Sequence, residues 1–254
     1  MFALFVELNL LLLSMIATLV AAALTVPAGF GLATMLTPIV LLWLPPHEAI
    51  AVVAIIHGAH NAYKLKLLRH NVDFNAVKRY GWALILGAII GAMLHSYIPS
   101  DPLLLVVGVA LIILPILSVT EKWTKIRLPD SEDRIGGFGS GFFGGLTGHQ
   151  GALRAMFLQK RLPDKVAYAA TASILALAVD LTRIPIYLFF EGNGILDEYI
   201  LILCLVSAAL LGVNLGKRWL TKWQQSKIRI GILLAIVTSG ILYIAEASAN
   251  LGYW

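Results

Sequence analysis

The chain has 254 residues, of which 59% are hydrophobic and only 13% are charged. Soluble domains carry about a quarter charged residues, so this composition excludes an ordinary soluble domain and favours an integral membrane protein. The net charge of +5 raises the question of nucleic-acid binding, but the basic residues lie in short stretches between apolar segments, and we expect no nucleic-acid partner. A single cysteine excludes a disulfide framework and a Cys-based metal site.

Apolar runs separated by polar or Gly/Pro breaks predict an all-α, multi-pass membrane domain. In chain order we expect segments at 5–27, 30–44, 46–68, 77–98 and 102–120, a polar linker at 121–133, and segments at 134–147, 150–160, 163–190, 197–218 and 226–249. The linker divides the domain into an N-terminal half, 1–120, and a C-terminal half, 134–254.

The two halves resemble each other in sequence. Leu44-Pro45 aligns with Leu162-Pro163 at an offset of 118 residues, and four further positions between 44 and 56 are identical at that offset. In each half the second run, 30–44 or 150–160, is too short to span a bilayer core of roughly 30 Å. We therefore interpret 1–44 and 134–161 as Gly-broken hairpins, each followed by three membrane helices. The expected fold is two inverted repeats, an arrangement found in transporters.

The charges predict the orientation of these segments. Seventeen of the 19 Lys and Arg residues lie in four stretches, 64–79, 121–134, 160–165 and 217–229. Turns 98–102 and 191–198 hold acidic residues and no Lys or Arg. The hairpin arrangement puts the basic stretches on one side, which the positive-inside rule assigns to the cytoplasm. The sequence therefore predicts a plasma or inner membrane protein with both termini outside.

Arg154 is one of two arginines outside these stretches, and it lies three residues after Gly151 in the return arm of the second hairpin. A cation inside a membrane domain is unfavourable unless it is compensated, and it indicates function by default. A guanidinium offers a planar set of donors that suits a small oxyanion, and a nearby helix start adds backbone N–H groups. We expect Arg154 to contact an anionic substrate. The alternative is a structural arginine that caps carbonyl groups or reaches the cytoplasmic interface.

The hairpin tips supply the other candidate contacts. They are Thr147, Gly148, His149, Gln150 and Gly151 in the second hairpin, and Gly29, Phe30, Gly31 and Thr34 in the first. Glycines let a backbone approach a ligand closely, and the His and Gln side chains can donate to an anion. Alternatively, the polar residues cap broken helix ends and the glycines only form tight turns.

Arg183 is the other arginine, and the rise of the helix predicts a position near the outer face. Asp180, three residues earlier, can pair with it, either as a structural ion pair or as an outer gate. In the third segment His57 and Asn61 share a helix face, and His57 is a candidate for binding substrate or a coupling proton. His57 and His60 could also be two metal ligands, but no third ligand is evident, so we predict no metal and no cofactor.

Two stretches resemble the sulfite exporter TauE/SafE family. They are Pro27 to Pro38 (PAGFGLATMLTP) and Gly137 to Arg154 (GFGSGFFGGLTGHQGALR), and the similarity extends over nearly the whole chain. The resemblance implies transport of small sulfur-containing anions such as sulfite or organosulfonates, driven by an ion gradient and without ATP hydrolysis. The chain departs from the family pattern where Gly31-Leu-Ala and Gln150-Gly-Ala replace Gly-Gly-Gly, and where Leu158 stands near the place of a second Pro.

The leading hypothesis is a secondary transporter, an exporter, whose partners are a small anionic substrate and the lipid bilayer. A passive anion channel and a carrier for another small organic anion remain alternatives. An intramembrane enzyme is disfavoured because no nucleophile motif accompanies the His pair. The sequence leaves open whether the chain forms a homodimer.

Overall fold

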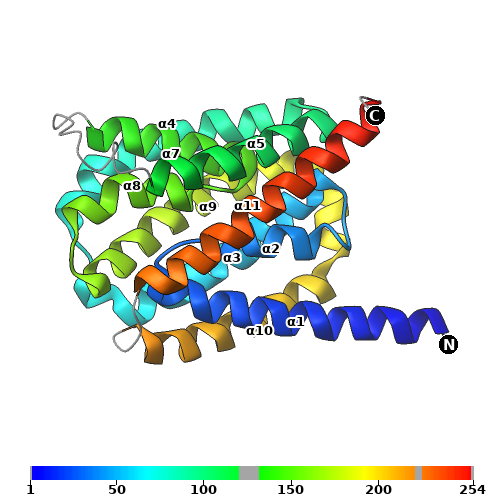
Figure 1. Ribbon diagram of the computed structural model, residues 1–254, viewed down its shortest axis with the longest axis horizontal. Coiled ribbons are helices and arrows are strands. Elements are labelled where there is room, and N and C mark those ends of the chain that lie inside the picture. Colours follow the sequence, from blue (N-terminus) through cyan, green and yellow to red (C-terminus); the bar gives the residue numbers. More distant parts are fainter. Residues whose placement is uncertain (1, 120–131, 221–224, 253–254) are drawn as a thin grey trace.

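The computed structural model describes residues 2–119, 132–220 and 225–252, and within them the chain forms helices and short connections without any β-strand. The predicted all-α fold is confirmed (Figure 1). The expected linker at 121–133 lies outside the described residues except for its last two, Glu132 and Asp133, which begin a helix.

The helices follow the predicted order. Before the linker they are α1 (Phe2–Ala28), α2 (Leu32–Val40), α3 (Pro46–Leu68), a 3₁₀ turn η1 (Arg69–Asn71), α4 (Phe74–Tyr97) and α5 (Ser100–Val119). After it they are α7 (Glu132–Thr147), α8 (Gly151–Arg161), α9 (Lys165–Asp197), α10 (Tyr199–Trp219) and α11 (Gln225–Asn250).

Local chemistry explains several of these boundaries. Pro46 occupies the first turn of α3, where its missing N–H is not needed. The Asp73 carboxylate accepts hydrogen bonds from the N–H groups of Asn75 and Ala76 at the start of α4, at 2.9 and 3.0 Å. The Asp164 carboxylate accepts one from Ala167 N at 2.7 Å and so caps α9.

Two boundaries differ from the prediction. The predicted turn at 191–198 is mostly helical, because α9 continues through Pro185 and Gly194 to Asp197. The end of α9 packs on the start of α3, where Gly194 lies against the Glu48 carboxylate, and this contact stabilises helix that the glycines alone would not favour. Helix α4 begins at Phe74 and not at the predicted residue 77, so the basic stretch at 64–79 is largely helical.

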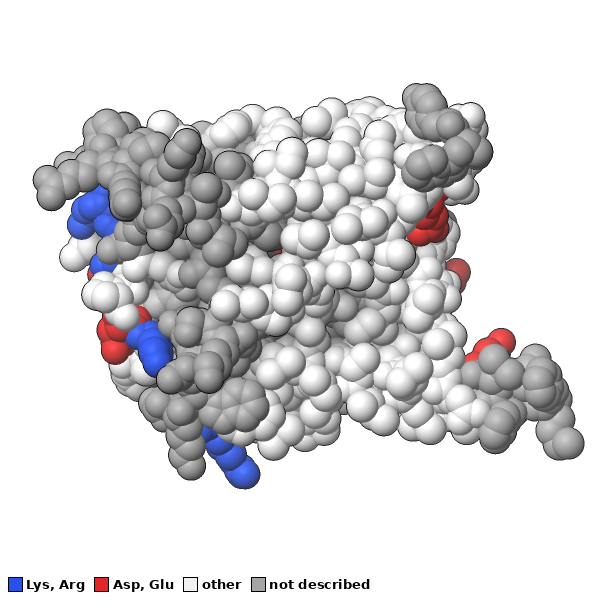
Figure 2. Space-filling view, viewed as in Figure 1, with Lys and Arg blue, Asp and Glu red and all other residues white. Residues whose placement is uncertain are grey.

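The surface of the bundle is suited to lipid. Stretches of α1, α4, α9, α10 and α11 are long and apolar enough to cross a membrane. Large apolar side chains point outward from them, including Leu13 and Phe189, which are 62% and 83% exposed. On the face seen in Figure 2 a broad belt is almost free of charged residues, and the Lys and Arg side chains drawn there lie at one end. We call this the basic end; its exposed residues include Lys66, Arg79, Arg134 and Arg218. The chain is a multi-pass membrane protein.

The helices pack in four main pairs. Helix α3 packs on α9, α5 on α11, α1 on α10 and α4 on α7. Glycines allow three of these pairs to approach closely: Gly141 of α7 faces the Leu84 carbonyl, Gly212 of α10 faces the Leu19 carbonyl, and Gly108 of α5 faces Gly240.

The two hairpins enter the bundle from opposite ends. In Figure 1 the N-terminus of α1 and the C-terminus of α11 lie at one end, whereas α7 begins at the other. Helices α2 and α8 have only 9 and 11 residues, or roughly 14–17 Å at about 1.5 Å per residue. Both are therefore too short to cross the membrane, as predicted. The first arm of the first hairpin, α1, is a full-length helix of 27 residues.

Candidate functional site

The first tip (29–31) and the second tip (147–151) meet inside the bundle. Gly29 and Gly148 adopt left-handed conformations, with φ of 81° and 84°, which turn the chain between the arms of each hairpin. Gly151, the first residue of α8, packs on the first tip: a Cβ built there would lie 2.7 Å from Phe30 Cβ and 3.4 Å from Gly31 N. The structure thus brings the two predicted tips into contact.

Three side chains cap the broken end of α7. Arg183 Nη1 donates to the Gly144 carbonyl at 2.9 Å, the Tyr187 hydroxyl donates to the Gly145 carbonyl, and His95 Nδ1 donates to the Leu146 carbonyl at 3.0 Å. The last carbonyls of a helix have no partner within the helix, and none is supplied by lipid. These caps let α7 end in the middle of the protein. The sequence did not indicate this role for His95 or Tyr187.

Asp180 connects the capping arginine to α3. Its Oδ1 accepts from Arg183 Nε at 3.1 Å and from Nη2 at 2.8 Å, and its Oδ2 lies 2.7 Å from His57 Nδ1. Asp180 and Arg183 are both fully buried. A carboxylate only accepts, so His57 Nδ1 carries the hydrogen of this bond. The predicted ion pair is present and extends to a third residue, which lies 123 positions away in the sequence.

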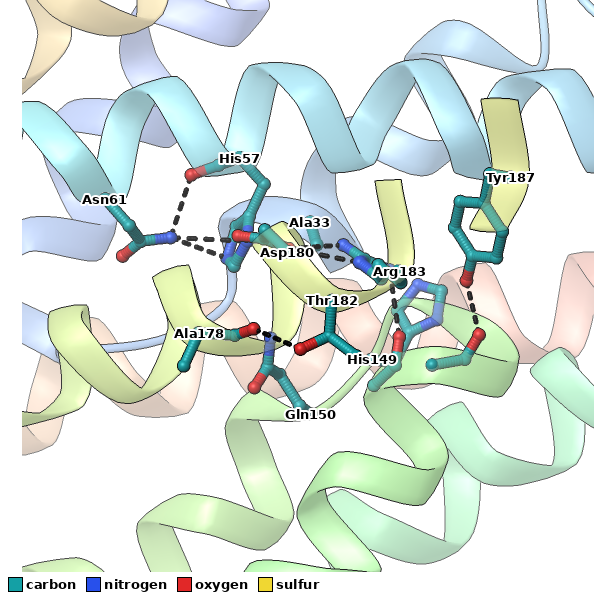
Figure 3. A network of polar contacts seen from close by, with 12 residues as sticks. Ala33, His57, Asn61, His149, Gln150, Ala178, Asp180, Thr182, Arg183 and Tyr187 are labelled. Atoms are coloured by element: carbon teal, nitrogen blue, oxygen red, sulfur yellow. Dashed lines mark hydrogen bonds and ion pairs between the residues drawn. The ribbon is translucent and has the colours of Figure 1, made fainter. Parts of the chain in front are cut away.

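The position of Arg183 differs from the prediction. It lies at the second tip, where its Nη1 is 3.0 Å from a Cβ built at Gly148, and not near the outer face. The reason is the length of α9, which has 33 residues and places Arg183 well inside the helix. Figure 3 shows Arg183 between Asp180 and the second hairpin, with His149 close to it.

His57 and Asn61 lie on the face of α3 that points into the bundle. Asn61 Nδ2 donates to the His57 carbonyl at 2.9 Å and lies against the imidazole ring. Asn61 therefore helps to orient His57 toward Asp180 (Figure 3). The structure places both candidates beside the tips.

Arg154 is 2% exposed, so its side chain lies inside the bundle and not at the surface of the basic end. Its Nη1 donates to Gln150 Oε1 at 2.8 Å, whereas its Nε is buried and has no hydrogen-bond partner among the described residues. Gln150 Nε2 and both ring nitrogens of His149 are likewise buried and without a partner in that part of the chain. The second tip thus holds several buried donor groups with no acceptor.

Thr147 and Thr34 have more ordinary surroundings. The Thr147 hydroxyl donates to the Phe143 carbonyl at 2.8 Å and accepts from His149 N at 3.3 Å, so it stabilises the turn. Thr34 is buried in the first turn of α2, next to the first tip.

Lys64 belongs to the basic stretch at 64–79, which the positive-inside rule assigns to the cytoplasmic side. The structure places it in α3, where it is only 3% exposed. It lies seven positions after His57, on the same helix face. The spacing of His57, His60, Asn61 and Lys64 is the signal that identifies this face.

A cavity of about 130 Å³ opens near the basic end. Its lining includes Tyr80, Leu158 and Arg161, and Arg161 Nε donates to Asp133 Oδ1 at 3.1 Å. Leu158 and Arg161 follow Arg154 by four and seven residues on α8, so all three share one helix face. The cavity therefore lies in line with Arg154.

Metal-binding groups are few at the tips. Within the described residues no group of three or more His, Cys, Asp or Glu side chains is arranged to hold a metal ion. The rings of His57 and His60 are stacked with centroids 6.5 Å apart.

A family model described as sulfite exporter TauE/SafE matches residues 14–243. No curated protein and no solved structure matches the chain. The matched range includes both tips, Lys64, Arg154 and the Asp180–Arg183 pair.

Proposed function

Because the chain belongs to the sulfite exporter TauE/SafE family, whose members are transporters and not enzymes, we propose that it is a secondary transporter that exports small sulfur-containing anions such as sulfite or organosulfonates. The substrate binds between the two Gly-rich tips, near the middle of the membrane.

The observation that carries this proposal is the set of buried donors at the second tip. Arg154 Nε, Gln150 Nε2 and the His149 ring have no acceptor among the described residues. A buried donor without a partner is destabilising by about 1–3 kcal/mol, and a buried cation without a counter-charge by more. An oxyanion supplies acceptors and negative charge together, so it suits the Arg154 and Gln150 donors and the His149 ring nitrogen that carries a hydrogen.

We also propose that the two halves are inverted repeats. The contacts between helices fit this relation. If α1 is exchanged with α7, α3 with α9, α4 with α10 and α5 with α11, the α1–α10 contact becomes the α4–α7 contact. The same exchange maps the α3–α9 and α5–α11 contacts onto themselves. This pairing supports a two-fold relation, which in transporters allows one bundle to rock against the other around a fixed site.

The route to the cytoplasm passes through the cavity at the basic end. The cavity lies in line with Arg154, and the ion pair between Asp133 and Arg161 stands beside its mouth. Rocking that separates α8 from α4 widens this route, and the reverse movement opens the opposite side. His57, bonded to Asp180, carries a coupling proton in this scheme.

Replacing Arg154 tests the substrate site. In proteoliposomes, Arg154→Gln should abolish sulfite counterflow and weaken sulfite binding roughly 30-fold or more, since losing one partner of a buried charge pair costs about 2–5 kcal/mol. Arg218→Gln, a change at an exposed arginine of α10, is the matched control and should leave both unchanged.

Wild-type counterflow by Arg154→Gln would reject the site. Flux without counterflow in the unmodified protein would instead identify a passive anion channel, because only a carrier exchanges substrate across the membrane through one alternating site.

A further inference from the structure

A second, larger cavity lies next to the one that opens near the basic end. It has a volume of about 380 Å³, and we call it the peripheral cavity. It lies near the start of α4 and of α7, and it is lined by Lys78, Arg79, Trp82, Asp133 and Arg134. Arg79 and Asp133 line both cavities. The transport route proposed above does not use the peripheral cavity.

The peripheral cavity faces the outside of the bundle. Its three cationic residues are exposed, and the Trp82 side chain is 51% exposed. The guanidinium carbon of Arg134 lies 5.6 Å from the centre of the Trp82 ring, and this cation–π contact positions Arg134 without neutralising its charge. In the smaller cavity, by contrast, Tyr80 and Leu158 are almost fully buried. An exposed Trp near the end of a membrane helix is typical of the boundary between lipid and water, so a lipid headgroup can reach the peripheral cavity.

Positive charge dominates the lining of the peripheral cavity. Its only carboxylate is Asp133, whose Oδ1 already accepts a hydrogen bond from Arg161 Nε at 3.1 Å. Within the described residues no carboxylate forms an ion pair with Lys78, Arg79 or Arg134. Three cations therefore line this cavity without a counter-charge from the described part of the chain, and the cavity suits an anionic group.

Helices α4 and α7 run side by side in the same direction. Gly137 of α7 faces the Tyr80 carbonyl of α4, and Gly145, eight residues later, faces the Ala88 carbonyl, eight residues later on α4. Both helices therefore lead from the basic end toward the middle of the membrane, and the cations near their starts lie at the same end.

Apolar side chains continue from the peripheral cavity along the outside of these two helices. On α4, Leu86 follows Trp82 by four residues and is 48% exposed. On α7, Phe138 follows Arg134 by four residues and is 42% exposed. Residues four apart lie on one face of a helix, so each helix presents an apolar side chain directly below the cavity. We call Leu86 and Phe138, together with Ile85 and Ile89 of α4, the apolar strip; all four are more than one-third exposed.

We propose that the peripheral cavity binds the phosphate group of an anionic phospholipid, whose acyl chains lie on the apolar strip of α4 and α7. The anionic headgroup supplies the counter-charge that the three cations lack. Basic pockets between membrane helices on the cytoplasmic side bind anionic headgroups in the same way. A free phosphate ion would match the cations but not the apolar strip, so the two features together favour a lipid. The site is separate from the hairpin tips, and the inference does not depend on the transport function.

Native mass spectrometry of the purified protein in detergent tests this proposal, because it counts the lipids that stay bound. The probes are palmitoyl-oleoyl phosphatidylglycerol, which is anionic, and phosphatidylcholine with the same chains, which has no net charge. The unmodified protein should bind phosphatidylglycerol at least about tenfold more tightly, since each Lys or Arg near an anionic lipid surface strengthens the attraction about fivefold.

A double substitution in the cavity identifies the site. Lys78→Gln combined with Arg134→Gln removes two cations from the lining, and it should weaken phosphatidylglycerol binding at least about tenfold while leaving phosphatidylcholine binding unchanged. The matched control is Lys217→Gln combined with Arg218→Gln, which removes two exposed cations from the end of α10 and should retain the preference. All four positions are exposed, so both variants should unfold close to the temperature of the unmodified protein.

Competition with inorganic phosphate separates a lipid from a free anion. Excess inorganic phosphate should leave phosphatidylglycerol bound, because it makes no contact with the apolar strip. Displacement of the lipid by inorganic phosphate would identify a site for a free anion and overturn the lipid assignment. Equal affinity of the unmodified protein for the two lipids would also overturn it. Equal loss of phosphatidylglycerol binding in the α10 control would do the same, because it would show attraction by net charge alone.

Discussion

At the scale of single residues, the two intramembrane arginines have opposite surroundings. Arg183 directs three donors to Asp180 and the Gly144 carbonyl, and its charge is balanced. Arg154 has a neutral amide oxygen as its recorded acceptor, and its Nε has no partner among the described residues. Arg183 is therefore suited to hold the second hairpin in place, and Arg154 to bind a ligand.

His57 leads to a prediction about the coupling of substrate transport to a proton gradient. The Asp180 carboxylate lies 2.7 Å from His57 Nδ1 and can act as the counter-charge of an imidazole that has taken up a second proton. His57→Gln retains a donor for Asp180 but cannot carry that proton. We expect sulfite counterflow to continue in His57→Gln, while sulfite transport driven by an imposed pH gradient falls to the level without a gradient.

Transport assays in proteoliposomes distinguish the outcomes for His57. His70→Gln, a change at an exposed histidine of η1, is the control and should respond normally to the gradient. If His57→Gln responds as well as the control does, His57 is not the proton carrier. If it also loses counterflow, the residue has a role in the site beyond coupling.

At the scale of elements, glycine decides how closely the helices approach. A Cβ at Gly141 of α7 would collide with the Leu84 carbonyl of α4, and backbone cannot move aside as a flexible side chain does. Gly141→Ala should therefore destabilise the protein by roughly 1–3 kcal/mol, as overpacking does in well-packed interiors.

The control for this change is Gly231→Ala in α11, where a Cβ would meet no atom within 4 Å. It should be neutral or slightly stabilising, because alanine favours a helix by about 1 kcal/mol over glycine. Thermal unfolding in detergent measures both variants. Equal unfolding temperatures of Gly141→Ala and Gly231→Ala would show that α4 and α7 can move apart without a loss of stability.

At the scale of the whole molecule, charge predicts orientation. The Lys and Arg side chains drawn in Figure 2 lie at the basic end, and the start of α1 and the end of α11 lie at the opposite end (Figure 1). In a background in which the single cysteine is removed by Cys204→Ser, we expect Asp197→Cys to react with a membrane-impermeant thiol reagent added to intact cells. Arg218→Cys, at the basic end, should react only after the membrane is opened. The reverse pattern would contradict the positive-inside assignment.

The sequence alone determined the properties that depend on local or summed chemistry. Composition predicted the lipid environment, because apolar surface of this extent requires it. Gly and Pro predicted the breaks between α1 and α2 and between α7 and α8, since backbone preferences act over a few residues. The same signals were misleading at Gly192 and Gly194, where α9 stays helical and Gly194 packs against Glu48 of α3.

Only the tertiary structure decided which charges are compensated. Spacing along one helix indicated the Asp180–Arg183 pair, but the bond from Asp180 to His57 joins residues 123 positions apart. The burial of Lys64 likewise depends on how α3 packs against its neighbours. Charge balance in a membrane interior is a property of neighbours in space, and neighbours from distant segments are known only when the helices are assembled.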